Sequence, residues 1–308
     1  KKKKKLCSCG RPIVVGLSEN DADKKAVADL SRQANEQNGA VAELTKARVE
    51  QLRAEIAAEQ AFERALKKAR GEIVEALENA LSIVDPSSLA NMTNDQLTDL
   101  ILQAGLGGAI DVFIEQQDLI RESIKKTFET VDPTLEFNSI LPQIDNLQIQ
   151  SSNAVFDEIV IPIYQKSIRE SLRDMALEIP VQTAISELQT KMKKKEGSAL
   201  TEVKTEISQY GRRINAVAAT AAGLKNFLYT GPRDGVTRNF CRALVNLVVK
   251  DQQMKQLNNN QGLNVITSGG GYNCRHSWSP VSEGFIKAAK LNRAKKSDII
   301  KANTGAKK

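Results

Sequence analysis

The chain has 308 residues, of which 41% are hydrophobic and only 4% aromatic, and its formal net charge is +7. Glycine and proline are few, while Ala, Leu, Gln, Glu and Lys are abundant, which excludes collagen-like, mucin-like and disulfide-knot proteins. Four cysteines in a chain of this length do not make an oxidised framework and favour a reducing compartment. We expect a mainly α protein.

Charge is distributed unevenly along the chain. Residues 1–11 carry six basic and no acidic side chains, residues 285–308 carry eight basic and one acidic, and residues 72–190 carry six basic and twenty acidic. Lysine-rich ends can bind phosphate non-specifically, whereas an acidic middle cannot; the alternative is that the lysines only keep the ends soluble. Candidate DNA-binding residues are Lys1, Lys2, Lys3, Lys4, Lys5, Lys287, Lys290, Lys295 and Lys296.

The first strong helical pattern covers residues 38–84. This stretch is almost free of helix breakers, and its apolar residues recur at helical spacing. Asp85 and Pro86 should end the helix, because proline disfavours helical geometry in the residue before it. We therefore expect a basic, flexible N-terminal segment over residues 1–37, followed by a helical body over residues 38–229.

Shorter helices should follow in the body. Thr93 is a candidate N-cap for a helix over 94–106, a glycine-rich break follows, and residues 109–130 form another helix. We expect an irregular stretch over 134–153, then a helix over 154–178 that is kinked near Pro162. A last helix starts at Pro180 and ends in the lysines at 191–195. No stretch approaches about 20 uninterrupted apolar residues, so we expect neither export nor a membrane span.

A heptad pattern is the clearest periodic signal. Between residues 200 and 228, apolar side chains recur with alternating spacings of three and four, which is typical of a coiled-coil seam. The seam needs a partner, either the helix over 38–84 or a second copy in a homo-oligomer, and we favour a bundle within one chain. The seam residues are Leu200, Val203, Ile207, Tyr210, Ile214, Val217, Ala221, Leu224 and Leu228.

The heptad pattern ends near residue 230, and signals for turns and short elements follow. A turn over 231–235 precedes Thr237, a candidate cap for a helix over 238–254, and residues 263–267 have the β-branched content of a strand. The glycines at 269–271 lack the spacing of a phosphate-binding loop and indicate a hinge. In an extended chain over 272–278, alternate side chains would share one face. These elements predict a small α+β domain over 230–284, followed by a basic tail over 285–308.

Three residues of this domain could hold a metal. Cys241, Cys274 and His276 offer the thiol and imidazole ligands that zinc prefers. The alternative is that both cysteines are buried thiols in a hydrophobic corner. We therefore expect no cofactor, with a structural zinc ion as the alternative that stays open. A structural site needs a fourth ligand, for which the candidates are Asp234, Cys7 and Cys9.

Catalysis by a Cys/His pair is not predicted. On an extended strand, residues two apart are separated by about 6–7 Å, from a rise of ~3.3 Å per residue, which is too far for a direct hydrogen bond. The chain also has a single histidine, which excludes sites that need a pair. Asp234 and Arg238 are expected to form a cap and an ion pair at a helix start, and the alternative is a functional contact.

Two segments of the domain carry a recognisable motif, GPRDGVTRNFC at 231–241 and GGGYNCRHSWSPV at 269–281. They resemble the Mu F-like phage minor head protein (head morphogenesis) family, in which an Asp and a Cys precede a Cys-Arg element and a Pro. Here Tyr272 and Asn273 stand where the family commonly has a His before that element, and His276 where it has a second Cys. The motif residues are Asp234, Arg238, Cys241, Cys274, Arg275, His276, Trp278 and Pro280.

The resemblance implies a structural, non-enzymatic minor head protein of a tailed bacteriophage, assembled in the host cytoplasm and located in the virion. It implies the portal protein and other head proteins as partners, and a role beside packaged DNA in assembly, packaging or ejection. Two alternatives stay open: a coiled-coil scaffold or adaptor that bridges virion components, and a zinc-dependent or cysteine-dependent enzyme. In all, the sequence predicts an elongated helical bundle or coiled-coil body with a small α+β C-terminal domain.

Overall fold

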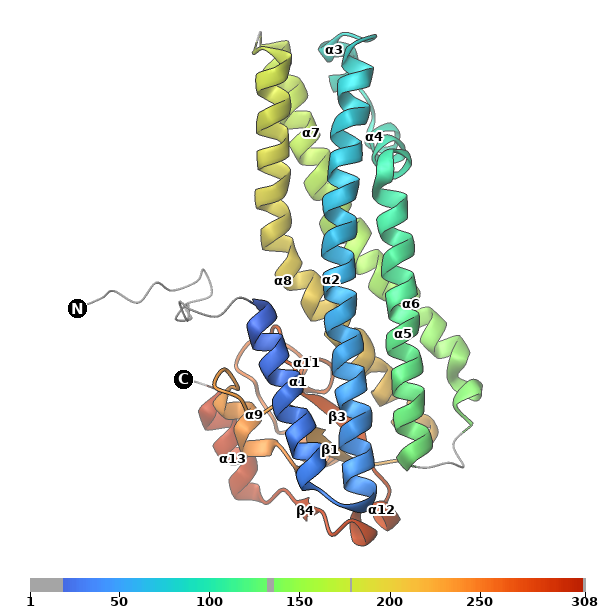
Figure 1. Cartoon of the computed structure of the whole chain (residues 1–308), viewed down its shortest axis with the longest axis vertical. Coiled ribbons are helices and arrows are strands. Elements are labelled where there is room, and N and C mark those ends of the chain that lie inside the picture. The colour runs from blue at the N-terminus through green and yellow to red at the C-terminus, as the bar shows by residue number, and fades with distance from the viewer. Residues whose placement is uncertain (1–18, 132–135, 178, 307–308) are drawn as a thin grey trace, which may run out of the picture.

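The computed structural model describes residues 19–131, 136–177 and 179–306. It has an elongated helical bundle with a small sheet-containing domain at one end (Figure 1), so the prediction of a mainly α protein is confirmed. The bundle consists of α1 (Glu19–Glu36), α2 (Gly39–Leu81), α3 (Pro86–Ala90), α4 (Asn94–Ile101), a π-helical turn (Leu102–Leu106), α5 (Gly107–Val131), a 3-10 turn (Phe137–Ile140), α6 (Leu141–Val155), a second π-helical turn (Phe156–Val160), α7 (Ile161–Ala176) and α8 (Val181–Ala221).

Helix α2 confirms the prediction of one long helix, since it runs unbroken for 43 residues. It ends shortly before Asp85, whose side chain accepts a hydrogen bond from the backbone N–H of Ser88 at 3.0 Å and caps α3. The predicted cap at Thr93 is also confirmed, because Thr93 and Gln96 form a reciprocal capping box at the start of α4. Local capping chemistry therefore sets these boundaries.

The break predicted at Gly105, Gly107 and Gly108 is a kink rather than a helix end. One π-helical turn joins α4 to α5, and within it Gly105 has a φ angle of 145°. Residues other than glycine rarely adopt this backbone conformation. A Cβ atom there would lie 2.4 Å from a carboxylate oxygen of Glu72. The second π-helical turn lies just before Pro162, near the predicted kink.

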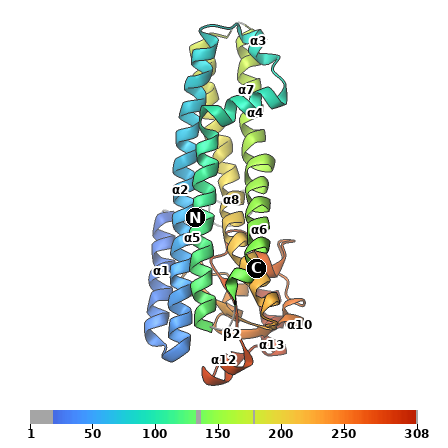
Figure 2. The ribbon, with the colours of Figure 1, turned by 90° about the vertical axis from the view of Figure 1, so that its right-hand side faces the viewer.

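The prediction of a flexible segment over 1–37 is wrong for residues 19–36, which form helix α1. Ala26 and Leu30 of α1 are buried against Val49 and Leu52 of α2, and the two helices lie side by side in both ribbon views (Figure 1, Figure 2). An amphipathic helix with this buried stripe has enough apolar contact to fold onto its neighbour. Lys1 to Lys5, Cys7 and Cys9 lie outside the described residues.

Two further bundle predictions are wrong. Helix α6 occupies most of the stretch predicted to be irregular over 134–153. The helix predicted to end in the lysines at 191–195 instead continues as α8 to Ala221. Two of these lysines lie on the side of α8 that meets α7, where Lys191 pairs with Asp174 at 2.9 Å and Lys195 with Glu170 at 3.1 Å.

The apolar seam of α8 faces the interior of the bundle. Val203, Ile207, Tyr210 and Ile214 are at most 1% exposed and belong to the same core as residues of α2, α5 and α7. Leu200 and Val217 are partly buried against that core. The packing within one chain agrees with the favoured prediction. The end of the seam is wrong, because Ala221 is exposed at the last turn, Leu224 follows the helix and Leu228 lies in a strand.

The C-terminal domain contains a four-stranded sheet in the order β3-β1-β2-β4. The central strand β1 pairs antiparallel with β2 and β3, and β2 pairs parallel with β4. Its elements are β1 (Asn226–Thr230), α9 (Asn239–Leu244), β2 (Leu247–Lys250), α10 (Asp251–Met254), α11 (Val265–Ser268), β3 (Ser277–Pro280), α12 (Glu283–Ala288), β4 (Asn292–Arg293) and α13 (Lys296–Gly305).

The domain differs from its prediction in three places. The helix predicted over 238–254 is the short helix α9 followed by strand β2 and helix α10, and the strand predicted over 263–267 is largely helix α11. The basic tail predicted over 285–308 is folded as α12, β4 and α13 up to residue 305. Ile299 and Ala302 of α13 are buried in the domain core. The domain therefore runs from Asn226 to Gly305.

One helical stretch in the described part of the chain, Asn94–Glu129, has the length and hydropathy of a membrane span, with a mean hydropathy of 1.5 in its most apolar window. Core helices pass the same test. Phe113, Ile120 and Ile124 of this stretch lie in the bundle core, where Phe113 packs edge-to-face with Phe62 and Phe156. We therefore describe it as a bundle helix.

Candidate functional site

Three separate segments of the C-terminal domain bring two thiols, an imidazole and a phenol together. Tyr229 lies on β1, Cys241 on α9, and Cys274 and His276 lie in the loop that leads into β3. The antiparallel register places Tyr229 directly opposite Trp278. The four side chains are at most 3% exposed, so the predicted site residues Cys241, Cys274 and His276 do form one cluster.

The polar atoms of the cluster lie close to one another. The Sγ atoms of Cys241 and Cys274 are 3.8 Å apart, and Cys274 Sγ is 3.8 Å from His276 Nδ1. The Tyr229 hydroxyl lies 3.4 Å from Cys241 Sγ and 3.7 Å from Cys274 Sγ. The sulfur and imidazole atoms all fall within 4.8 Å of one another. This arrangement fits a soft metal ion or an exchange of protons among the four groups.

The short distance between Cys274 and His276 contradicts the expected separation of an extended chain. The loop turns instead, because Asn273 has φ of 51° and the backbone N–H of Cys274 donates to the carbonyl of Gly271 at 3.2 Å. Only Ser277–Pro280 is a strand in this part of the domain. The thiol and the imidazole therefore face one another although they are two residues apart.

Glycines leave room for the side chains of the cluster. The sequence predicted only a hinge for the glycines at 269–271. A Cβ atom on Gly270 would lie 2.4 Å from Cys241 Sγ, and one on Gly231 would lie 2.4 Å from the ring of His276. The backbone N–H of Gly270 also donates to Cys274 Sγ at 3.2 Å. These positions need glycine because backbone packs directly against the two functional side chains.

Protonation is unequal across the two thiols. The hydrogen bond with Cys274 and burial raise the pKa of the Cys241 thiol. The same hydrogen bond and the nearby imidazole of His276 lower the pKa of the Cys274 thiol. Burial raises the pKa of the Tyr229 hydroxyl. The two shifts are opposite, so Cys274 gives up its proton more readily than Cys241.

Asp234 does not join the cluster and does not pair with Arg238, contrary to both predictions. Its carboxylate forms an ion pair with Arg275 at 2.8 Å and accepts a hydrogen bond from the Thr237 hydroxyl at 2.9 Å. Arg238 donates instead to the backbone carbonyl of Tyr272. Thr237 is not a helix cap, since α9 begins at Asn239 after Arg238. These contacts fix the turn before α9 against the loop over 269–276, which carries Cys274 and His276.

The other two motif residues support the same strand. Trp278 is 1% exposed, its indole Nε1 donates to the carbonyl of Val265 at 2.9 Å, and its ring packs against that of Tyr229 with centroids 4.1 Å apart. Pro280 pairs with Phe227 at the end of β3. Trp278 and Pro280 thus act as packing residues that position β3 beside β1.

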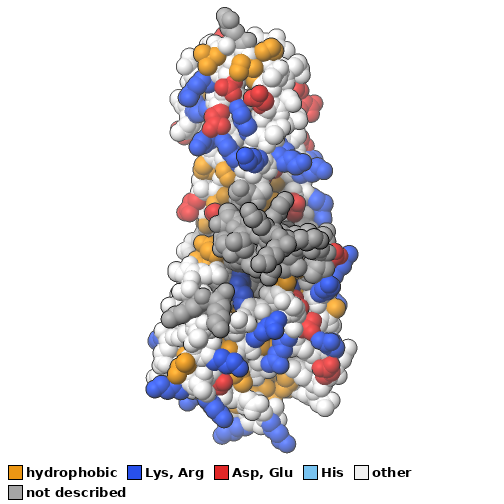
Figure 3. All heavy atoms as spheres, turned by 90° about the vertical axis from the view of Figure 1, so that its left-hand side faces the viewer, with side chains coloured by type: hydrophobic (Ala, Val, Ile, Leu, Met, Phe, Trp, Pro, Cys, Tyr) orange, Lys and Arg blue, Asp and Glu red, His pale blue; other side chains and the backbone are white. Residues whose placement is uncertain are grey.

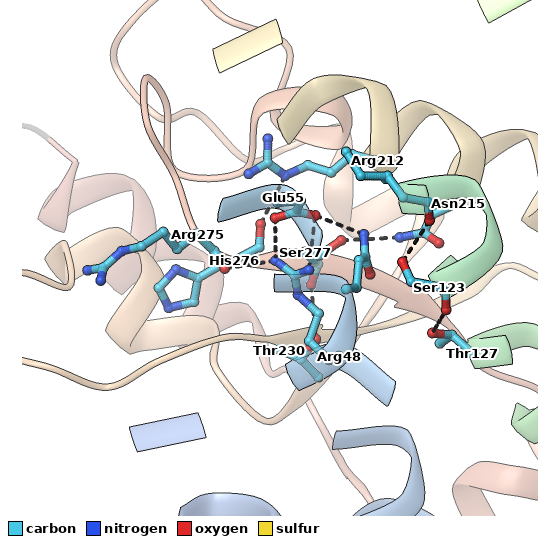
Figure 4. Close-up of polar contacts among 12 residues, drawn as sticks. Arg48, Glu55, Ser123, Thr127, Arg212, Asn215, Thr230, Arg275, His276 and Ser277 are labelled. Atoms are coloured by element: carbon cyan, nitrogen blue, oxygen red, sulfur yellow. Dashed lines mark hydrogen bonds and ion pairs between the residues drawn. The ribbon is translucent and has the colours of Figure 1, made fainter. Parts of the chain in front are cut away.

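Two arginines from the bundle hold the loop that carries Cys274 and His276 in place (Figure 4). Arg212 of α8 donates to the carbonyls of Thr267 at 3.0 Å and His276 at 2.9 Å, and also to that of Cys274. Arg48 of α2 donates to the carbonyl of Arg275 at 3.0 Å. The bundle therefore positions the site in the neighbouring domain.

Arg48 is itself neutralised inside the bundle. Its guanidinium forms a two-pronged ion pair with Glu55 at 3.0 and 3.2 Å, and Gln51 donates to the same carboxylate at 3.0 Å. Arg48 and Glu55 fall on the apolar stripe of α2 that Leu44 and Leu52 define. Charged residues on that stripe are the sequence signal that could have identified this connection.

Comparisons with protein-family models, with curated proteins and with solved structures find no match to this chain.

Proposed function

We propose that this chain is a structural minor head protein of a tailed bacteriophage, located in the virion after assembly in the host cytoplasm. In this proposal it associates with the portal and other head proteins, and it contacts packaged DNA non-specifically during assembly, packaging or ejection. The resemblance of the motif at 231–281 is one support. The charge of the folded domain that carries this motif is the observation on which the proposal chiefly rests.

The C-terminal domain concentrates basic residues at one end of the molecule. Residues 226–305 contain twelve Lys and Arg residues and four Asp and Glu residues. Lys and Arg side chains lie over the lower end of the molecule in the space-filling view (Figure 3). The bundle segment at 72–190 is strongly acidic. A phosphate backbone would therefore bind the domain and be repelled by the bundle.

The predicted DNA-binding lysines of the C-terminal region lie at fixed places in the fold. Lys287 is in α12, Lys290 follows it, and Lys295 and Lys296 are at the start of α13; all four are exposed. Because they belong to folded elements, these charges keep a constant spacing. Such a surface suits backbone contact without base recognition.

The alternatives have less support. An adaptor that oligomerises through the α8 seam would need that seam free, but its central residues are buried in the bundle core. An enzyme using Cys274 would need substrate access, but both thiols are at most 2% exposed. A structural role uses the bundle as a spacer and the domain as a contact surface.

Salt-dependent DNA binding by the full chain tests the DNA-contact part of the proposal. Fluorescence anisotropy with duplex DNA should show log affinity falling linearly with log salt, with a slope of about −0.9 for each phosphate that the protein neutralises. Replacing Lys287, Lys290, Lys295 and Lys296 by Gln should make this slope shallower. The matched control replaces four exposed bundle lysines, Lys67, Lys68, Lys193 and Lys194, and should leave it unchanged. Equal slopes for both variants would contradict the proposed surface.

A further inference from the structure

The four polar atoms of the Cys241, Cys274, His276 and Tyr229 cluster have the separations of a metal coordination shell. The four distances given for them lie between 3.4 and 3.8 Å. Around a tetrahedral zinc ion, with zinc–sulfur distances of about 2.3 Å and zinc–nitrogen or zinc–oxygen distances of about 2.0–2.2 Å, neighbouring ligand atoms lie roughly 3.3–3.8 Å apart. Four of the six edges of a zinc-sized tetrahedron are therefore matched, and the ligand atoms of Cys241 and His276 lie within 4.8 Å of each other.

We propose that Cys241, Cys274, His276 and the hydroxyl of Tyr229 bind one Zn²⁺ ion, with Tyr229 as the fourth ligand. This assignment replaces the acid and the N-terminal cysteines that the sequence offered for that position. Asp234 is engaged by Arg275, whereas the Tyr229 hydroxyl already contacts both sulfur atoms. The site does not depend on the proposed role in the virion.

Charge balance favours zinc at this buried place. Two thiolates, a neutral imidazole and a neutral phenol give a net charge of zero with Zn²⁺, so no uncompensated charge is buried. When the metal binds, two zinc–sulfur bonds form, and any proton still held by either thiol passes to solvent. His276 would coordinate through Nδ1 and carry its proton on Nε2.

The groups around the cluster would act as an outer shell. The N–H of Gly270 donates to Cys274 Sγ at 3.2 Å, which stabilises a thiolate. Arg212 holds the carbonyls of Cys274 and His276, so both ligands are fixed by the bundle. The ring of Tyr229 stacks on that of His276 with centroids 5.3 Å apart and an angle of 18° between planes. These contacts orient the ligands before metal binds.

Zinc would tie β1, α9 and the loop before β3 together. These segments are separated in sequence, and their polar contacts at the cluster are weak contacts to sulfur. Metal binding should therefore raise the melting temperature of the domain.

Metal content of the full chain purified under reducing conditions tests the proposal. Elemental analysis should find one zinc per chain, and Cys274→Ser or Cys241→Ser should lower it at least tenfold. Replacing Cys7 and Cys9 together by Ser is the matched control and should leave one zinc per chain. A wild-type chain with no zinc that also takes up no added Co²⁺ would overturn the site. So would the loss of two hydrogens from the Cys7 and Cys9 to Ser control, in which only Cys241 and Cys274 remain to form a disulfide.

Tyr229→Phe tests the fourth ligand without removing the stacked ring. In the cobalt-substituted protein, loss of the phenol oxygen should alter the visible absorption of the bound ion and weaken affinity at least tenfold. An unchanged spectrum and affinity would remove Tyr229 from the ligand set and overturn the four-ligand assignment. Should the cysteine variants fail to fold, chelator removal and readdition of zinc to the wild-type chain gives the same information. Reversible loss and recovery of melting temperature would support the site, and no change would overturn it.

Discussion

The bundle and the C-terminal domain each bury a polar cluster, and the two clusters are neutralised differently. In the bundle, the Tyr164 hydroxyl donates to Glu196 at 2.6 Å and Arg70 forms an ion pair with the same carboxylate. The cluster of Cys241, Cys274, His276 and Tyr229 has sulfur contacts of 3.4–3.8 Å and no carboxylate partner among the described residues. The bundle cluster therefore carries its own counter-charge, whereas the domain cluster depends on protons or on a metal.

A second difference concerns what holds each region together. The bundle has one continuous apolar core, to which α2, α5, α7 and α8 contribute. The domain has a smaller separate core, and its loop that carries Cys274 and His276 is anchored by arginines from the bundle. Breaking the connection between the two regions should thus have a larger effect than weakening either cluster.

The largest expected effect comes from Arg48→Ala, which removes one of the two arginines of this connection. Glu55 would be left as a buried carboxylate without its guanidinium, so we expect a loss of about 3–5 kcal/mol in the free energy of unfolding. Chemical denaturation measures it. Arg53→Ala on the same helix removes only an exposed pair with Glu50 and should cost about 0.2–1 kcal/mol. Similar losses for both variants would contradict the role given to Arg48.

Tyr164→Phe sharpens the comparison inside the bundle. It removes a hydrogen bond to a buried carboxylate, for which we expect a loss of about 1.5–3 kcal/mol. Tyr210→Phe is the matched control, because the Tyr210 hydroxyl is buried without a partner and its removal should cost nothing. If thermal denaturation shows the two substitutions to be equally costly, the hydrogen bond from Tyr164 to Glu196 does not stabilise the bundle.

A smaller effect is expected in the pH dependence of stability. Burial raises the pKa of Glu196 above its ordinary value of 4.5, despite the Tyr164 and Arg70 contacts. Between the ordinary pKa and the raised pKa of the folded chain, Glu196 is protonated in the folded chain and ionised in the unfolded chain. Stability therefore falls as the pH rises from 4.5 through the raised pKa. The stability of the wild type relative to Glu196→Gln should decline there and be constant above it. A constant difference throughout would show that the pKa is not raised.

The long bundle helices could be predicted because their signals are local. The breaker-free stretch at 38–84 and the cap at Thr93 needed only neighbouring residues. The length of α8 was missed because Lys191 and Lys195 resemble a helix end, whereas their charges are compensated by α7. Helix α1 was missed because the basic start suggested flexibility for the whole segment.

The domain was less predictable because its elements are short and pair across the sequence. Extending the heptad pattern to Leu228 hid strand β1, and with it Tyr229. Cys241, Cys274 and His276 were identified by residue type alone, but their geometry depends on Asn273, on Gly270 and on Arg212 from a distant helix. No local pattern encodes these contacts, and Arg48 was visible only as a charge on an apolar stripe.

Quantitative mass spectrometry of procapsids and mature heads purified from the source of the chain tests the proposed function most directly. The portal and major capsid proteins in the same sample provide the scale. A minor head protein should be present in an amount comparable to the portal protein and far below the major capsid protein. A decrease after DNA release would mark it as ejected with the genome. Absence from both kinds of particle would contradict the proposed function.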